Sequence, residues 1–170
     1  MKMISKVLVD TCFLIELAGK DKECHQSALD YFQYFNENNI EYYLSPIVAA
    51  EYWHNNLVAD FPSTHFKHLT FNCIDGFQTG SIARVLKEKN GIVANGTDKH
   101  DIKDDYKLLA QLIVNNNIDC FITKDGNLIT KYVEPLLDYF PALRNVMFID
   151  IKSQPITSTF KPQIVIDFPE

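Results

Sequence analysis

Hydrophobic residues along the chain alternate between short β-rich runs and segments with the period of a helix. The first β-rich run, residues 6–9, is followed by apolar positions at helical spacing in Phe13, Leu14 and Leu17. Parallel strands need a crossover between them, and a helix usually supplies it, so strands that alternate with helices indicate a parallel sheet. The pattern predicts an α/β protein with three α/β/α layers around a central, mostly parallel sheet.

Five strands are expected before residue 150, and a further strand-like run, residues 163–166, lies in the tail. The five are residues 6–9, 40–44, 68–73, 119–123 and 146–149. Helices are expected at about 24–36, at 78–89 and at 128–139, the last disturbed by Pro135. Ser45 and Pro46 have the residue types of an N-cap and a first helical position, which predicts a helix running to about Asp60.

Length and composition are those of one globular domain. The 170 residues are 46% hydrophobic and 22% charged, and no repeat or linker divides them. The apolar runs are much shorter than the roughly 20 residues of a membrane span, and the start lacks a signal peptide, so a cytoplasmic protein without membrane contact is expected. The four cysteines form no CxxC pair and the histidines no HExxH motif, which predicts free thiols, Cys73 and Cys120 in the core, and no zinc.

The net charge of −6 argues against binding of nucleic acid through a broad positively charged surface. It does not exclude a nuclease with acidic active-site residues. Six of the sixteen basic residues lie in one stretch: Arg84, Lys87, Lys89, Lys99, Lys103 and Lys107. This stretch is either a solvated helical face or a local rim that binds phosphates.

Four acids occupy positions where a globular α/β chain normally places apolar residues. Asp10 ends the run 7–9, and Asp125 follows the run 120–123. At about 100° per residue, Glu51 and Asp105 fall within the apolar stripes of their predicted helices. Asp101 lies one turn before Asp105 on the same face, whereas Asp104 lies on the flank and is expected to be solvated. Buried acids cost free energy unless something compensates them, and a divalent metal is a common compensator.

Each acid, taken alone, could also have a purely structural role. Asp10 would cap a helix, and Glu51 would pair with a basic residue. Asp105 would be a first-turn acid favoured by the helix dipole, and Asp125 would be a turn residue. Their joint placement favours a site, because the carboxyl ends of parallel strands meet at one edge of a sheet. Four carboxylates in one cleft repel each other until a cation binds, and oxygen ligands suit Mg²⁺ or Mn²⁺. Such ions can support hydrolysis of a phosphodiester bond.

Four segments carry a resemblance to a known family: VLVDT (7–11), SPIVAAE (45–51), DYKLLA (105–110) and FITKD (121–125). In their order and spacing the chain resembles the PIN domain family of α/β ribonucleases, many of which are VapC-type toxins of toxin–antitoxin pairs. The resemblance covers roughly residues 5–150. It implies a PIN-like metal-dependent nuclease domain over 1–150, with 151–170 as a C-terminal extension that packs on the same domain or contacts a partner.

The resemblance also implies roles for individual residues. Asp10, Glu51, Asp105 and Asp125 would be the catalytic acids that bind Mg²⁺ or Mn²⁺. The supporting residues would be Thr11, Thr123, Asp101 and Asn127, and the RNA-binding residues would be Lys103, Lys107 and Lys124. The three lysines are alternatively ordinary surface residues. Cys12 departs from the family, which often has Asn or Ser there, and Asn127 stands near the place of a frequent further acid.

The activity that the resemblance implies is an endoribonuclease, with RNA as substrate, an antitoxin as partner and a homodimer as assembly. A PIN-fold scaffold that binds RNA or protein without cleaving it is the main alternative. A phosphatase resembling the haloacid dehalogenase family would need a second Asp at the position of Cys12. A receiver-like domain would need an acid in place of Leu8 or Val9.

Overall fold

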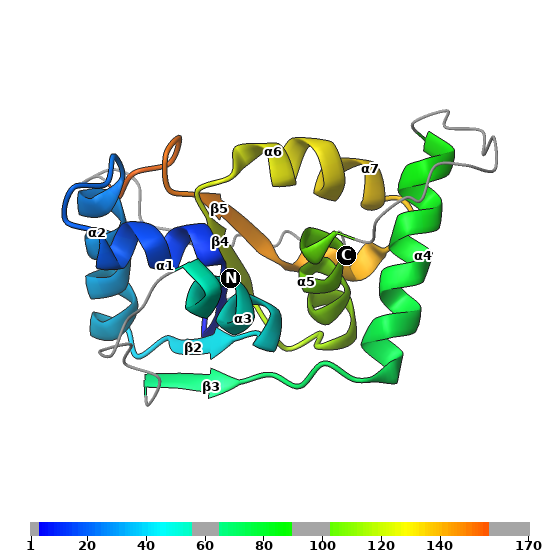
Figure 1. Ribbon diagram of the computed structural model, residues 1–170, viewed down its shortest axis with the longest axis horizontal. Helices are drawn as coiled ribbons and strands as arrows, with labels where there is room; N and C mark the ends of the chain where they lie inside the picture. Colours follow the sequence, from blue (N-terminus) through cyan, green and yellow to red (C-terminus); the bar gives the residue numbers. More distant parts are fainter. Residues whose placement is uncertain (1–3, 56–64, 90–102, 157–170) are drawn as a thin grey trace, which may run out of the picture.

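The computed structural model describes residues 4–55, 65–89 and 103–156 (Figure 1). Its five strands form one sheet, parallel throughout, in the order β3-β2-β1-β4-β5. The strands are β1 (Lys6–Val9), β2 (Glu41–Leu44), β3 (Phe66–His68), β4 (Cys120–Thr123) and β5 (Met147–Asp150). The predicted fold class is confirmed.

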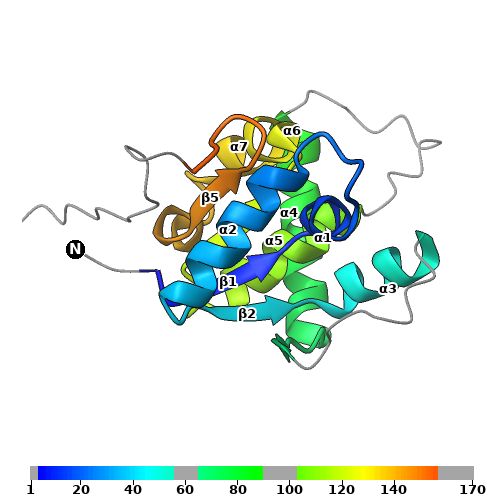
Figure 2. The same cartoon turned by 90° about the vertical axis from the view of Figure 1, so that its left-hand side faces the viewer.

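Helices cover both faces of this sheet. The first half of the chain contributes α1 (Thr11–Ala18), α2 (His25–Glu37) and α3 (Pro46–Asn55). The second half contributes α4 (Cys73–Lys89), α5 (Asp104–Val114), α6 (Gly126–Leu128) and α7 (Glu134–Leu136). In Figures 1 and 2, α2 lies against one face of the sheet, and α4 and α5 lie against the other. The three-layer arrangement follows from this distribution.

The central strands β1 and β4 are almost wholly buried. Val7, Leu8 and Val9 are 0% exposed, and every residue of β4 is buried. Continuous apolar runs of this kind belong to parallel strands that are covered on both faces. Burying each such Val or Leu side chain stabilises the fold by roughly 1.5–3 kcal/mol. The carboxyl ends of β1 and β4 are therefore carried by the most deeply buried strands of the sheet.

Several local predictions are confirmed. Ser45 begins α3, and its hydroxyl oxygen accepts a hydrogen bond from the Ile47 N–H at 3.0 Å. The predicted end of that helix near residue 60 lies outside the described residues. The segment predicted as a helix over 128–139 is helical from Gly126 to Leu136 and is disturbed near Pro135, since one π-helical turn, Ile129–Val133, lies between α6 and α7.

The predicted strand over 68–73 is wrong beyond its first residue, and the following helix starts five residues earlier than predicted. The reason is a reciprocal cap. The Asn72 side chain accepts from the Ile74 N–H at 2.8 Å, and Asp75 accepts from the Asn72 N–H at 2.7 Å. Such a pair fixes a helix start. Cys73, predicted to lie in the core, is therefore an exposed helical residue, while Cys120 is buried as expected.

The first residues of the C-terminal extension pack on the domain. The Ile151 N–H donates to the Thr123 carbonyl at 3.0 Å, and the Tyr31 hydroxyl donates to the Gln154 carbonyl at 2.6 Å. Residues 157–170, including the strand-like run 163–166, lie outside the described part.

All four cysteines are free thiols. None of the described helices combines the length and the apolar character that crossing a membrane requires.

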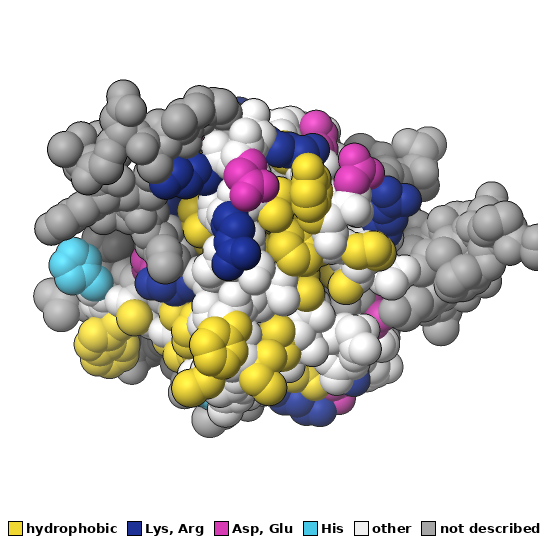
Figure 3. All heavy atoms as spheres, turned by 90° about the vertical axis from the view of Figure 1, so that its right-hand side faces the viewer, with side chains coloured by type: hydrophobic (Ala, Val, Ile, Leu, Met, Phe, Trp, Pro, Cys, Tyr) yellow, Lys and Arg dark blue, Asp and Glu magenta, His cyan; other side chains and the backbone are white. Residues whose placement is uncertain are grey.

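Apolar side chains are exposed on α4. The first turns of α4 expose Ile74 and Phe77, which are 64% and 78% exposed. Figure 3 looks onto the side of the molecule that carries α4, and apolar side chains gather on its lower part.

A buried carboxylate joins the end of β4 to the loop between α1 and α2. Glu16 is 3% exposed; one of its oxygens accepts from the Lys124 ammonium and the other from the Cys24 N–H, both at 2.7 Å. Lys124 also lies 3.4 Å from the exposed Glu23, which pairs with Lys152 at 3.2 Å. Glu16 is thus the interior anchor of a chain of ion pairs that ends at the surface.

We expect Glu16→Ala to lower the free energy of unfolding by about 2–3 kcal/mol, because it leaves a half-buried ammonium and a buried N–H without their partner. Urea unfolding followed by circular dichroism measures the change. Glu23→Ala removes a carboxylate from the same network at the surface and is expected to leave the midpoint nearly unchanged. Equal effects of the two substitutions would contradict the assignment of Glu16 as the anchor.

Candidate active site at the strand ends

Asp10 is the most enclosed acid of the site. It directly follows β1 and is 7% exposed. One carboxylate oxygen accepts from the Thr11 N–H at 2.7 Å, and the other accepts from the Thr123 hydroxyl at 2.7 Å. Burial raises the pKa of Asp10 despite these hydrogen bonds. The residue also caps α1, so the helix-cap interpretation and the site interpretation describe the same side chain.

Thr123 connects Asp10 to Asp125. Its fully buried hydroxyl donates to Asp10 and accepts from the Asp125 N–H at 2.9 Å. Asp125 itself caps α6, since its carboxylate accepts from the Asn127 N–H at 2.9 Å. The hydroxyl predicted from the sequence as a supporting group thus links the carboxyl ends of β1 and β4.

Cys12 belongs to this hydrogen-bond network. Its thiol donates to Asp10 at 2.9 Å, accepts from the Lys124 N–H at 2.9 Å and lies 3.1 Å from the Thr123 hydroxyl. Burial, followed by the negative charge of Asp10, raises the pKa of this thiol to about 12. Cys12 is therefore a neutral hydrogen-bond donor at ordinary pH. The sequence patterns did not place Cys12 among the site residues, although its distance of two residues from Asp10 was a usable signal.

Glu51 is attached to the other side of Asp10 through Thr11. The Thr11 hydroxyl donates to a carboxylate oxygen of Glu51, and the Thr11 N–H donates to Asp10. Burial raises the pKa of Glu51, and Asp104 and Asp10 raise it further. The Asp104 side chain, expected to be solvated, is 42% exposed, and it also contributes to the raised pKa of Glu51. It is half-buried and pairs with Lys107 at 2.5 Å.

Asp105 completes the set of predicted acids that the structure brings together. Burial raises its pKa to about 6, and the charges of Asp10 and Asp125 contribute to the increase. Asp10, Asp105 and Asp125 therefore act on one another electrostatically, as expected for carboxylates gathered at one sheet edge. Asp101, the predicted neighbour of Asp105, lies outside the described residues.

The carboxylates influence one another electrostatically, and three of the four accept hydrogen bonds from protein donors. Among the described residues, no three His, Cys, Asp or Glu side chains stand in an arrangement that holds a metal ion as it is. Asp10 and Glu51 accept from threonine hydroxyls, and Asp125 accepts from the Asn127 N–H in its cap on α6. Binding an ion would require these side chains to exchange hydrogen bonds for metal ligation.

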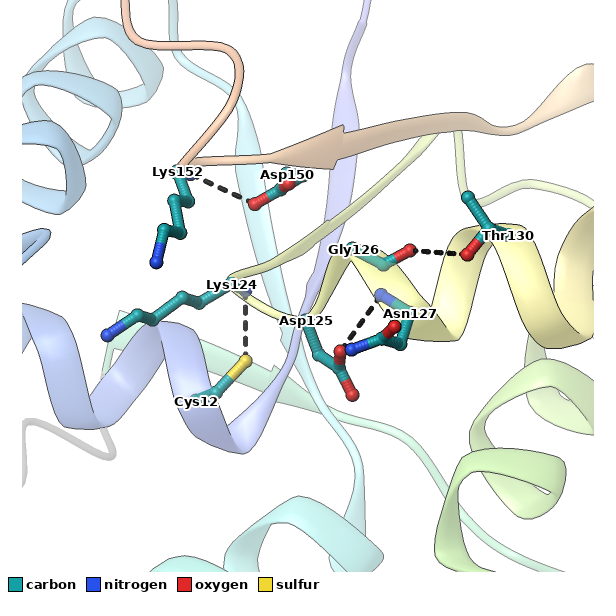
Figure 4. Close-up of a pocket in the computed structure, with 8 residues that line it drawn as sticks. All are labelled: Cys12, Lys124, Asp125, Gly126, Asn127, Thr130, Asp150 and Lys152. Atoms are coloured by element: carbon teal, nitrogen blue, oxygen red, sulfur yellow. Dashed lines mark hydrogen bonds between the residues drawn. The ribbon is translucent and has the colours of Figure 1, made fainter.

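Two hollows open beside the acids. The first, of about 610 Å³, is lined by Cys12, Lys124, Asp125, Gly126, Asn127, Thr130, Asp150 and Lys152 (Figure 4). The second, of about 650 Å³, is lined by Pro46, Ile47, Ala50, Glu51, Leu69, Thr70, Phe71, Asp104 and Lys107.

Asp150, at the end of β5, lines the first hollow and is an acid that the sequence patterns did not single out. It accepts from the Lys152 N–H at 2.9 Å and from the Ser153 hydroxyl at 2.7 Å.

The three lysines predicted to bind RNA all have protein partners. Lys103 donates to the Tyr132 hydroxyl at 2.7 Å, and its ammonium lies 5.2 Å from the centre of that ring. Lys107 pairs with Asp104, and Lys124 pairs with Glu16. In Figure 4 the Lys124 side chain extends away from the Asp125 carboxylate. Of the three, Lys107 and Lys124 line a hollow beside the acids.

The raised pKa of Asp105 gives the metal-free protein a defined pH dependence. An unfolded Asp has a pKa of about 4, so between about pH 4 and 6 the folded state binds more protons than the unfolded state. Stability therefore falls as the pH rises through this window. We expect Asp105→Asn to raise the melting temperature in EDTA at pH 7.5 and to have little effect at pH 4. Asp138→Asn, at an exposed acid on the surface, is the matched control. A lower melting temperature of Asp105→Asn at pH 7.5 would contradict the electrostatic argument.

No protein-family profile matches this chain, and no curated protein matches it. The fold is similar to that of a chain in the crystal structure of VapBC2 from Rickettsia felis bound to a DNA fragment from their promoter. The TM-score is 0.52 and the identity 16%; the match covers 85% of this chain and 97% of that chain. At this identity the likeness shows the fold alone, an all-parallel α/β sheet flanked by helices.

Proposed function

We propose that this chain is a Mg²⁺- or Mn²⁺-dependent endoribonuclease of the PIN type that hydrolyses RNA phosphodiester bonds. One observation carries the proposal: Asp10, Glu51, Asp105 and Asp125 come from four elements to the carboxyl ends of β1 and β4, and burial raises the pKa of the first three. A fold has little reason to gather mutually repelling acids there unless a cation offsets their charge.

The donor chemistry fits a hard divalent cation, because the side chains offer carboxylate oxygens and their repulsion favours positive charge. Asp10 and Asp125 would be the principal ligands, with Glu51 and Asp105 completing the set directly or through water. Such an ion, when bound, activates water and stabilises the charge that develops on a phosphate. Thr11 and Thr123 hold the carboxylates in place, and the buried surroundings keep the electrostatic interactions strong.

We further propose that the chain is the toxin of a toxin–antitoxin pair. The similarity to a chain of the VapBC2 structure supports an antitoxin partner. Such an antitoxin would cover the acidic cleft or insert into it, and the toxin would form a homodimer.

A binding-only scaffold is the second candidate. It is favoured by the absence, among the described residues, of three acids already arranged to hold an ion. The two candidates differ in metal binding: the nuclease requires Mn²⁺ to bind at the acids and to be lost from Asp10→Asn, whereas the scaffold requires neither.

Cleavage of structured RNA is the first test. We expect purified protein with Mn²⁺ to cleave members of a mixed RNA panel, and both EDTA and Asp10→Asn to lower the rate at least 100-fold, because each removes ligation from the site. Asp138→Asn, which changes an exposed acid outside the site, is expected to keep the parent rate. Cleavage that survives Asp10→Asn would assign the activity to a contaminant or to another site.

Metal binding is tested separately through stability. A ligand that binds only the folded state raises the melting temperature, and protons compete with the ion for carboxylates of raised pKa. We therefore expect Mn²⁺ to stabilise the parent protein more at pH 7.5 than at pH 5.5, and Asp10→Asn much less at either pH. Unchanged melting temperatures at both pH values would exclude the proposed ion site.

A further inference from the structure

Three buried polar atoms on α4 and α5 have no hydrogen-bond partner among the residues that the structure describes. They are Oδ1 of Asp75, Nε2 of Gln78 and Oε1 of Gln111. The Asp75 and Gln111 residues are both 0% exposed, so bulk solvent does not reach them. A buried polar atom without a partner costs free energy, and such atoms are few in folded proteins. The three atoms therefore indicate a group that the protein binds there.

Two of these side chains are fixed in place through their other polar atom. Asp75 accepts from the Asn72 N–H at 2.7 Å through its Oδ2 atom. The side-chain nitrogen of Gln111 donates to the Thr70 carbonyl at 2.9 Å. Neither side chain can turn toward a new partner without breaking the hydrogen bond that it already makes.

The packing of α4 against α5 brings the three side chains to one place, which we call the α4–α5 junction. The backbone groups that anchor two of them belong to Thr70 and Asn72, whose Cα atoms are at most about 7 Å apart. Asp75 and Gln78 are three positions apart on α4, and residues at this spacing are neighbours on one helix face. The segment after β3 runs past α5 into α4, and α4 packs along α5 (Figure 1).

The unpaired atoms match the hydrogen-bonding groups of one water molecule. Asp75 and Gln111 each offer an acceptor, and Gln78 offers a donor. Water can donate two hydrogen bonds and accept a third, and buried water molecules typically make about three bonds to polar groups that lack other partners. We propose that the α4–α5 junction binds one structural water molecule, which donates to Asp75 and Gln111 and accepts from Gln78.

A cation is the competing occupant, and Gln78 argues against it. The two oxygens at the junction would suit a hard cation, because such ions bind oxygen ligands. The Gln78 nitrogen, however, carries hydrogens, which would point their positive charge at the ion. A water molecule satisfies all three groups without this conflict.

The bound water connects two helices and, through the anchored side chains, the segment that follows β3. One of these helices, α5, also carries Asp105, so the junction holds in place the helix that supplies one of the four acids. This inference concerns the scaffold of the site and does not depend on the proposed nuclease activity.

The sign of a stability change tests the water site. Gln78→Met replaces the amide with an apolar side chain of similar length. With water bound, the substitution removes one of its hydrogen bonds, and we expect the melting temperature to fall by about 2–4 °C. Without an occupant, the substitution would remove an unpaired buried donor and raise the melting temperature, which would contradict the proposal. Gln33→Met, at an exposed glutamine of α2, is the matched control and should change the melting temperature much less.

A crystal structure of the full chain identifies the occupant directly and does not rely on a variant. We expect one density peak at about 2.7–3.2 Å from each of the three atoms. A crystal soaked in rubidium chloride should show no anomalous signal at this peak. An anomalous signal would assign the junction to a monovalent cation. A direct hydrogen bond between Gln78 and Asp75, with no density between the side chains, would also overturn the water site.

Discussion

The hydrogen bond from the buried Thr123 hydroxyl to Asp10 is the contact on which the site depends. It joins the carboxyl ends of β1 and β4, the two central strands, and the same hydroxyl accepts from the Asp125 N–H. Because the hydroxyl is fully buried, losing either partner would leave a polar group without compensation in the interior. Two acids that are 115 positions apart in the sequence are thereby held in a fixed relation by one side chain.

The cluster is assembled at the expense of stability. Burial raises the pKa of Asp10, Glu51 and Asp105, so their ionised forms are disfavoured in the folded state at neutral pH. Hydrogen-bond donors reduce the free-energy cost of keeping these carboxylates ionised. Threonine hydroxyls donate to Asp10 and Glu51, and the Cys12 thiol also donates to Asp10. A structural role alone would be served as well by neutral side chains. The retained charge is the feature that favours a ligand of opposite charge.

Much of this arrangement could be predicted from the sequence, and the failures have physical causes. Strand ends and helix stripes are local patterns, so Asp10, Glu51, Asp105 and Asp125 could be placed on their elements without coordinates. The start of α4 was missed because the reciprocal cap of Asn72 and Asp75 outweighed the β-rich residues before it. Asp104 is partly exposed to solvent as expected, but its influence on the pKa of Glu51 was missed because a helical angle defines a face and not the residues of the neighbouring helix.

The partners of the lysines limit what these residues could contribute to phosphate binding in the proposed nuclease. Lys103, Lys107 and Lys124 are each engaged by a tyrosine or a carboxylate, and the net charge is −6, so free ammonium groups contribute little to phosphate binding. Affinity that rests on many phosphate contacts falls steeply with salt. The proposed nuclease would instead hold its substrate through a cation at the acids, and few phosphate contacts of this kind make the affinity less dependent on salt.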